Sequence, residues 1–364
     1  MRDVPKLTAP RVTVARVPTD APESDGTLQW DATTLVLAEI EAGGCTGLGY
    51  TYSDPAIGAY IRDTLAQAIA GTSAFDIPAA HRAMQQALRN DGRAGIASMA
   101  VSAVDNALWD LKARLLDLSV AQLLGQAQDS VALYGSGGFT SYDDDRLARQ
   151  LGGWADDGFA FVKMKVGRDP ARDPERLRVA REAIGTDCQL FVDANGAFTR
   201  KQALAMAEHF AHHNVRWFEE PVSSDDLAGL RLLRDRAPPG MAITAGEYGY
   251  DPWYFRRMLQ AGAVDVIQAD ATRCCGITGF LKAARLAEAF HVPISAHCAP
   301  ALHLHVCAAL PDALHLEWFH DHVRIEHMLF DGAPKPSGGR AVPDPARPGF
   351  GLEPRRSEIA RHAV

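Results

Sequence analysis

Reactive side chains recur at nearly even spacing between residues 163 and 317. Each ends a short apolar run, and the next follows 20 to 28 residues later. One strand, one helix and two loops occupy roughly 25–30 residues, since eight such units fill a barrel of about 250 residues. The spacing therefore favours a barrel of parallel strands with its reactive groups gathered at one rim. The series is Lys165, Asp193, Glu219, Glu247, Asp270, His297 and Glu317.

Eight short apolar runs alternate with helical stretches from residue 131 onwards. Such runs are typical of parallel strands that are buried on both faces. Eight units favour a closed (β/α)8 barrel over an open doubly wound sheet, and no GxGxxG motif follows the first strand. The predicted strands are residues 131–135, 161–166, 190–194, 215–220, 241–247, 264–270, 292–297 and 313–318.

The N-terminal part has a different pattern. Strands are predicted at 11–17 and 33–40, and the polar segment 19–31 and the glycine-rich segment 43–55 are predicted loops. A helical pattern follows and stops at Gly125.

These patterns divide the chain into three parts. Residues 1–125 are predicted to form an α+β capping domain, because strands come first and helices follow. Residues 126–324 are predicted to form the catalytic barrel domain. Residues 325–364 are rich in loops, and we expect them to pack on the capping domain and complete it.

Composition excludes several classes of function. The net charge of -8 and the pI near 5.9 disfavour a nucleic-acid partner. No apolar run is long enough to span a membrane, and the first residues lack the apolar stretch of a signal peptide. The 6 cysteines form no CxxC pair, which is typical of free thiols in a reducing compartment. We therefore expect a cytoplasmic protein without a membrane partner.

Three carboxylates end consecutive predicted strands, namely Asp193, Glu219 and Glu247. Carboxylates that converge on one rim repel each other unless a cation lies between them. An all-oxygen site suits a hard metal, Mg²⁺ first and Mn²⁺ second. Glu220 follows Glu219 directly and is expected to point away from the barrel interior, because strand side chains alternate.

Two lysines, Lys163 and Lys165, lie two residues apart in the run FVKMKV and so face the same side of their strand. Mutual repulsion and burial are expected to lower the pKa of one of them. A lysine with a lowered pKa can act as a general base.

Three further residues end the last strands. Asp270 and His297 are close enough in the predicted barrel for a hydrogen bond, which would fix the histidine tautomer and provide a second base across the rim from Lys165. Glu317 is expected to be protonated and to donate a hydrogen bond to the enediolate of a metal-bound carboxylate substrate, a role that needs a raised pKa.

Together these motifs resemble the enolase superfamily and, within it, the mandelate racemase subgroup. The motifs are KMK at 163–165, VDAN at 192–195, WFEEP at 217–221, AGE at 245–247, the Asp270–His297 pair and LEW at 316–318. The resemblance covers essentially the whole chain. It implies a modified TIM barrel, a homo-oligomer and a small carboxylate substrate.

The resemblance also implies a role for each residue. Asp193, Glu219 and Glu247 bind Mg²⁺, Lys165 and His297 are opposed bases, and Asp270 supports His297. Lys163 holds the substrate carboxylate, and Glu317 is the electrophilic donor. Two capping loops, about 18–31 and 49–57, supply specificity. The candidate substrate contacts are Lys163, Trp30, Tyr50, Tyr52 and Asn195.

Two reactions remain open, and both begin with removal of the proton next to a carboxylate. Most relatives in this subgroup resemble acid-sugar dehydratases, so the first expectation is a lyase that forms a 2-keto-3-deoxy acid. The alternative is a racemase, epimerase or cycloisomerase on a hydroxy acid or lactone. A non-catalytic protein on the same fold is disfavoured, because the set of ligands and bases is intact.

Overall fold

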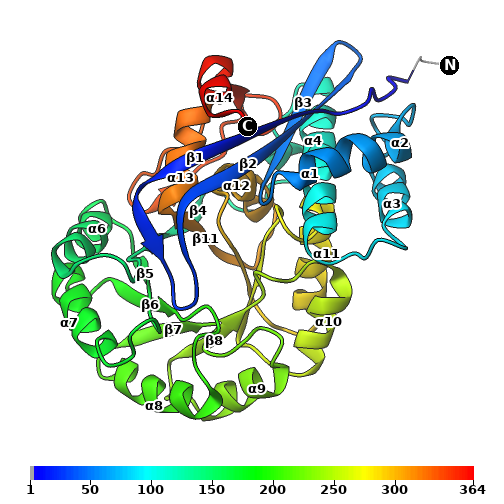
Figure 1. Ribbon diagram of the computed structural model, residues 1–364. Helices are drawn as coiled ribbons and strands as arrows, with labels where there is room; N and C mark the ends of the chain where they lie inside the picture. The colour runs from blue at the N-terminus through cyan, green and yellow to red at the C-terminus, as the bar shows by residue number, and fades with distance from the viewer. Residues whose placement is uncertain (1–3) are drawn as a thin grey trace.

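The computed structural model describes residues 4–364 and contains a closed barrel of eight parallel strands (Figure 1). The strands pair in chain order, and pairing of the last with the first closes the barrel. All eight strands predicted from the sequence are present. They are β4 (Val131–Gly137), β5 (Phe161–Lys165), β6 (Gln189–Asp193), β7 (Val215–Glu219), β8 (Ala242–Ala245), β9 (Val266–Ala269), β10 (Ile294–Ala296) and β11 (Ala313–Phe319).

Helices surround the barrel on its outer side (Figure 1). Residues of the loops fix where several of them begin. The Asp143 carboxylate accepts from the backbone N–H of Arg146 at the start of α6, and Thr199 and Gln202 form a capping box at the start of α8. The helices are α6 (Asp144–Asp156), α7 (Asp173–Ile184), α8 (Arg200–Ala211), α9 (Leu227–Arg236), α10 (Pro252–Gln260), α11 (Gly276–Ala289), α12 (Pro300–Ala308) and α13 (His320–Leu329).

The capping domain is a three-stranded antiparallel sheet with helices beside it. Its strands are β1 (Arg11–Ser24), β2 (Gln29–Ala42) and β3 (Cys45–Tyr52). The two loops predicted in this part are therefore wrong: residues 19–31 mostly extend β1 and β2, and residues 45–52 form β3. The helical elements are α1 (Ala56–Tyr60), the π-helix η1 (Ile61–Leu65), α2 (Ala66–Ile69), α3 (Ile77–Ala87), α4 (Ile96–Leu115) and α5 (Val120–Leu124).

Glycines in β3 let it pack directly on the backbone of α4. A Cβ atom on Gly49 would lie 2.3 Å from the backbone nitrogen of Ala107 and 2.4 Å from the carbonyl oxygen of Ala103. Gly47 meets the same helix equally closely. The glycine-rich composition that suggested a loop is thus a requirement of close strand–helix packing.

We expect Gly49→Ala to lower the free energy of unfolding by about 3 kcal/mol, because the added methyl group collides with backbone that cannot move aside cheaply. Urea unfolding followed by circular dichroism measures this change. Gly153→Ala is the control, since its Cβ would meet nothing within 4 Å. That helical substitution should stabilise by up to about 1 kcal/mol. Equal stability of Gly49→Ala and the unchanged protein would contradict the packing argument.

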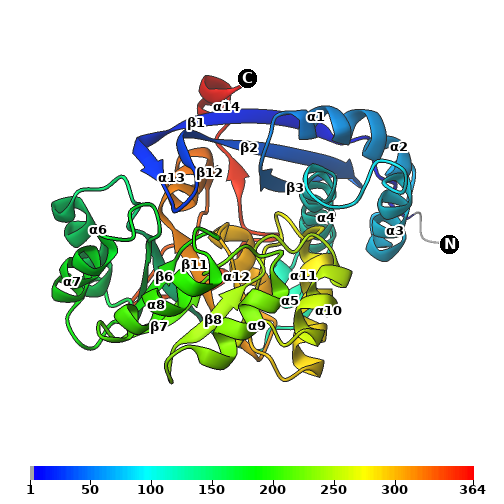
Figure 2. The ribbon, with the colours of Figure 1, turned by 60° about the horizontal axis from the view of Figure 1, so that its bottom comes forward.

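The hairpin of β1 and β2 extends from the capping helices across to the barrel near α6 and α13 (Figure 2). The pairing register shifts between Pro18 and Glu23, an irregularity of the kind that bends a strand. The hairpin is tied to the barrel by side chains that reach its backbone. Arg324 donates to the Pro18 carbonyl at 2.5 Å, and Ser141 donates to the Pro22 carbonyl at 2.7 Å.

The C-terminal segment crosses back to the capping sheet. Its elements are β12 (Phe330–Asp331), β13 (Arg340–Ala341), β14 (Glu353–Pro354) and α14 (Arg356–His362). The backbone N–H of Val364 donates to the Val14 carbonyl in β1, and Arg356 forms an ion pair with Glu39 in β2. Within residues 4–364, every helix is too short or too polar to cross a membrane.

Candidate active site

The reactive residues of the predicted series lie at one end of the barrel. Each ends its strand, lies near that end or follows within two residues. Lys165 and His297 are each 5% exposed, and the others are buried further. The barrel thus collects charged groups in a small volume that is shielded from water, as the strand-end spacing predicted.

The three carboxylates of the predicted metal site converge. Asp193, Glu219 and Glu247 each offer an oxygen, and these oxygens lie within 4.8 Å of one another. The Trp217 indole N–H donates to Glu219 Oε2 at 2.9 Å, and Arg273 donates to Glu247 Oε1 at 3.0 Å. These bonds hold the carboxylates in place, and the all-oxygen donor set fits a hard divalent cation.

The charges of the three carboxylates also favour a divalent cation at this site. Burial and the neighbouring Asp193 raise the pKa of Glu219 to about 8. Burial would also raise the pKa of Glu247, but His297 and Arg273 hold it well below its usual value. Buried like charges at this distance destabilise one another, and a bound cation relieves that repulsion.

The two lysines face the triad, but neither has the lowered pKa that the sequence predicted. Lys163 Nζ lies 2.6 Å from Glu219 Oε1, and Lys165 Nζ lies 2.5 Å from Asp193 Oδ2. Burial disfavours both charges, yet the adjoining carboxylates outweigh it and raise both pKa values. That prediction considered repulsion between the lysines and omitted the carboxylates.

His297 and Asp270 form the predicted pair. His297 Nδ1 lies 2.8 Å from Asp270 Oδ2, which leaves Nε2 facing the carboxylates. Burial opposes a charge on the ring, but Cys298, Glu247, Glu317 and Asp270 together raise the pKa of His297 well above its usual value.

The Glu317 carboxylate accepts hydrogen bonds and faces a lysine, and both favour its charged form. The prediction that its pKa is raised is therefore wrong. Ser136 Oγ donates to Oε1 at 2.6 Å, and Lys163 Nζ lies 2.9 Å from the same oxygen. Burial alone would raise the pKa, but Lys163 and His297 lower it below the usual value. Glu317 is therefore an anion in this arrangement.

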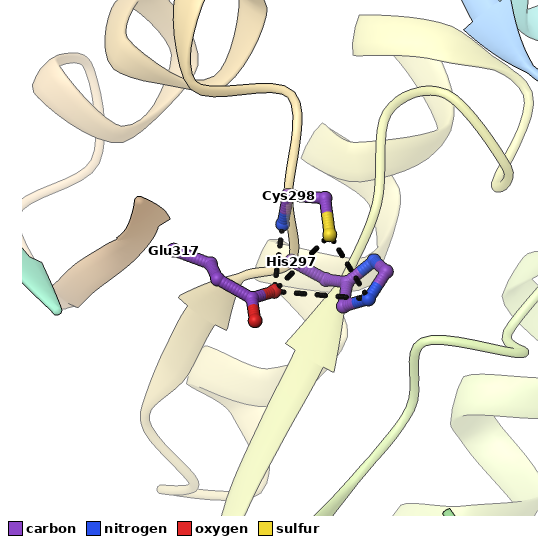
Figure 3. Close-up of side chains that lie close together, drawn as sticks. All are labelled: His297, Cys298 and Glu317. Carbon is purple, nitrogen blue, oxygen red and sulfur yellow. Dashed lines mark hydrogen bonds and ion pairs between the residues drawn. The ribbon is translucent and has the colours of Figure 1, made fainter. Parts of the chain in front are cut away.

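Cys298 is a site residue that the sequence analysis missed (Figure 3). Its Sγ lies 3.3 Å from His297 Nε2 and 3.3 Å from Glu317 Oε2, and its backbone N–H donates to that oxygen at 2.9 Å. The left-handed φ of 53° at Cys298 turns the chain sharply after β10. No motif in the sequence signalled this contact.

Arg273 and Glu220 also differ from what the sequence suggested. Arg273 was not predicted, yet it contacts Glu247 and lies 3.8 Å from Asp270. Glu220 has a left-handed φ of 37°, so the strand alternation behind its predicted outward orientation does not extend to it, and its side chain is buried. Burial and the charges of Glu247 and Asp193 raise its pKa.

The predicted substrate contacts fall into different environments. Trp30 is half-buried, packs edge-on against Phe139 and donates to Glu23 at 2.8 Å. Tyr52 stacks on a histidine, and its hydroxyl has no hydrogen-bond partner within residues 4–364. Asn195 lies beside the triad, with its backbone N–H bonded to Asp193. Tyr50 is fully buried and donates to Glu326 at 2.5 Å, and its contact with substrate stays a prediction.

Family comparisons agree with this geometry. The family model described as mandelate racemase / muconate lactonizing enzyme, N-terminal domain, matches residues 10–125. The model described as enolase C-terminal domain-like matches residues 146–358. The chain belongs to the mandelate racemase group of the enolase superfamily. This confirms the resemblance and the modified TIM barrel that it implied.

Relatives within the superfamily differ in their reactions. The chain is 31% identical to a 3,6-anhydro-alpha-L-galactonate cycloisomerase from Streptomyces coelicolor over 91% of each chain. It is 32% identical to an L-talarate/galactarate dehydratase from Salmonella typhimurium, over 82% of this chain and 77% of that one.

Solved structures extend the comparison. A mandelate racemase/muconate lactonizing enzyme-like protein from Rubrobacter xylanophilus has a TM-score of 0.97 and 54% identity, with 99% of this chain and 100% of that one covered. A racemase from Streptomyces coelicolor with bound magnesium has a TM-score of 0.92 and 30% identity, with 98% and 100% covered.

Proposed function

We propose that the protein removes the proton next to a substrate carboxylate, and that the substrate is an acid sugar that then loses water. The observation that carries this proposal is a pair of proton-transfer groups on two sides of one carboxylate triad. Lys165 contacts the triad at Asp193, and His297 contacts it at Glu247, where Nε2 lies 3.2 Å from Oε2. Two such groups can reach opposite faces of one carbon atom.

Asp193, Glu219 and Glu247 are the proposed ligands of Mg²⁺, with Mn²⁺ as a substitute. The bound cation supplies charge that stabilises the anion formed from the substrate. Lys163 adds a fixed ammonium group for the substrate carboxylate. A cation held by Asp193 would compete with Lys165 for the carboxylate. Since Asp193 is the neighbour that most raises the pKa of Lys165, such a cation would favour the neutral amine.

The proton transfers follow from the positions of the two groups. Lys165 Nζ accepts the proton from the carbon next to the carboxylate. His297 donates the proton on Nε2 to the β-hydroxyl, whose C–O bond breaks to release water. The enol that remains tautomerises to a 2-keto-3-deoxy acid. Asp270 keeps Nε2 directed at the substrate throughout.

The alternative is a cycloisomerase, epimerase or racemase. It is supported by the Streptomyces coelicolor cycloisomerase, which matches this chain over 91% of its length. In that reaction the proton returns to carbon, or a ring oxygen leaves in place of the hydroxyl and stays in the same molecule, so no water is released.

A substrate screen distinguishes the two reactions. The purified protein with Mg²⁺ is incubated with mono- and diacid sugars, and 2-keto acids are detected with a carbonyl reagent. A 2-keto acid formed from an open-chain acid establishes the dehydratase, because such a substrate has no ring oxygen that could leave in place of water. If no 2-keto acid forms but D₂O places deuterium next to the carboxylate, the alternative holds. Absence of both reactions with every acid would contradict the proposal. A homo-oligomeric state and a cytoplasmic location stay predictions.

A further inference from the structure

We infer that His297, Cys298 and Glu317 form a second metal site, which binds a thiophilic cation such as Zn²⁺ or Cd²⁺ and blocks the proton-transfer group on that side. The site is distinct from the oxygen triad in its donor atoms, because it offers one sulfur, one nitrogen and one oxygen. These atoms lie within 4.8 Å of one another, and all three residues are buried.

The spacing of the three donors fits tetrahedral coordination. Bonds of about 2.3 Å to sulfur and about 2.0 Å to nitrogen or oxygen imply donor separations of about 3.3–3.6 Å in a tetrahedron. The observed separations are 3.3 Å from Sγ to Nε2, 3.3 Å from Sγ to Oε2, and 3.7 Å from Nε2 to Oε2. A zinc-sized ion therefore needs only small shifts of these side chains.

The three donor side chains lie close to one another (Figure 3), and groups outside the picture hold them in place. Asp270 binds Nδ1 of His297 and leaves Nε2 free, which is the arrangement that supports histidine ligands of zinc. Ser136 and Lys163 both contact Oε1 of Glu317, so its other oxygen, Oε2, is the one that faces Cys298.

A fourth group faces the same point. Glu247 Oε2 is buried and has no hydrogen-bond partner within residues 4–364, yet it lies 3.2 Å from His297 Nε2. This oxygen or a solvent molecule can complete the coordination. Glu247 is also a proposed ligand of the Mg²⁺ site, so the solvent molecule is the fourth ligand when Mg²⁺ holds this carboxylate.

Binding has a defined chemical consequence. The Cys298 thiol and Nε2 of His297 each release a proton to solvent, the sulfur coordinates as thiolate, and the metal takes the Nε2 position that catalysis needs. Mg²⁺ cannot replace zinc here, since it prefers oxygen ligands. The site therefore makes the enzyme sensitive to thiophilic metals even when Mg²⁺ saturates the triad.

Cadmium absorption tests the site without any assay of the reaction. The full-length protein in excess Mg²⁺ is titrated with Cd²⁺, and the ultraviolet thiolate-to-cadmium band is recorded. We expect the band to saturate at one Cd²⁺ per chain. It should be absent in Cys298→Ser and unchanged in Cys45→Ser. Cys45 is the matched control, because it is the one cysteine of the six that is not buried. Cadmium bound at the oxygen triad alone gives no such band.

Two results would overturn the inference: absence of the band in the unchanged protein, or its persistence in folded Cys298→Ser. If that variant does not fold, X-ray absorption of the zinc complex of the unchanged protein decides. One sulfur with nitrogen or oxygen neighbours supports the site, and a shell of oxygen alone refutes it. These measurements do not depend on the proposed function. Once a substrate is known, Cys298→Ser should raise the half-inhibitory zinc concentration at least about tenfold.

Discussion

Lys165→Ala is expected to lower the rate of proton removal on one face of the substrate by about 10²- to 10⁴-fold, the usual contribution of a positioned base. The substitution removes the amine that contacts Asp193 and leaves the His297–Asp270 pair in place. Incorporation of deuterium from D₂O, followed by NMR for each stereoisomer, measures the two faces separately. Deuterium exchange on the substrate face nearest His297 should continue at its usual rate.

Lys282→Ala is the control for Lys165→Ala, because Lys282 is an exposed lysine of α11. It should leave both exchange rates unchanged. If Lys165→Ala keeps the full rate with every substrate and on both faces, Lys165 is not the base or is not used in this enzyme.

Removal of divalent cations should abolish activity, and added Mg²⁺ should restore it. Glu219→Gln should weaken Mg²⁺ binding by about 100-fold or more, since loss of groups that only support a ligand already costs 10- to 100-fold. Isothermal titration calorimetry measures the affinity independently of the reaction. Circular dichroism shows whether the variant is folded.

Asp225→Asn serves as the control for Glu219→Gln, because Asp225 is an exposed carboxylate a few residues further along the chain. Its Mg²⁺ affinity should match that of the unchanged protein. Full activity in a preparation shown to be free of metal would exclude the carboxylate triad as a required metal site.

The barrel could be predicted from the sequence because its strands are continuous apolar runs that end in reactive residues. In β5, for example, Lys163 and Lys165 face one side, and the alternation of the strand requires it. β3 could not be predicted in this way. Its glycines are selected by contact with residues of α4 that lie more than fifty positions further along the chain, and a local pattern does not contain that information.

In the site, too, some features could be predicted from the local sequence pattern and others depend on tertiary contacts. The carboxylates and the His297–Asp270 pair follow from strand-end positions. Cys298 and Glu220 depend on left-handed backbone conformations just beyond a strand, where alternation no longer applies. The pKa values of Lys163 and Glu317 depend on each other's charge at 2.9 Å, a distance that spacing along the chain does not give.

With Trp30 as a proposed substrate contact, the hairpin of β1 and β2 would separate the choice of substrate from the chemistry of the reaction. The proton-transfer groups stand on barrel strands, whereas Trp30 and Glu23 belong to a hairpin anchored on the capping sheet. Replacements in the hairpin can therefore accumulate, by evolution or by grafting from a relative, while the reactive geometry is inherited intact. New substrates can be acquired without reinventing the catalyst.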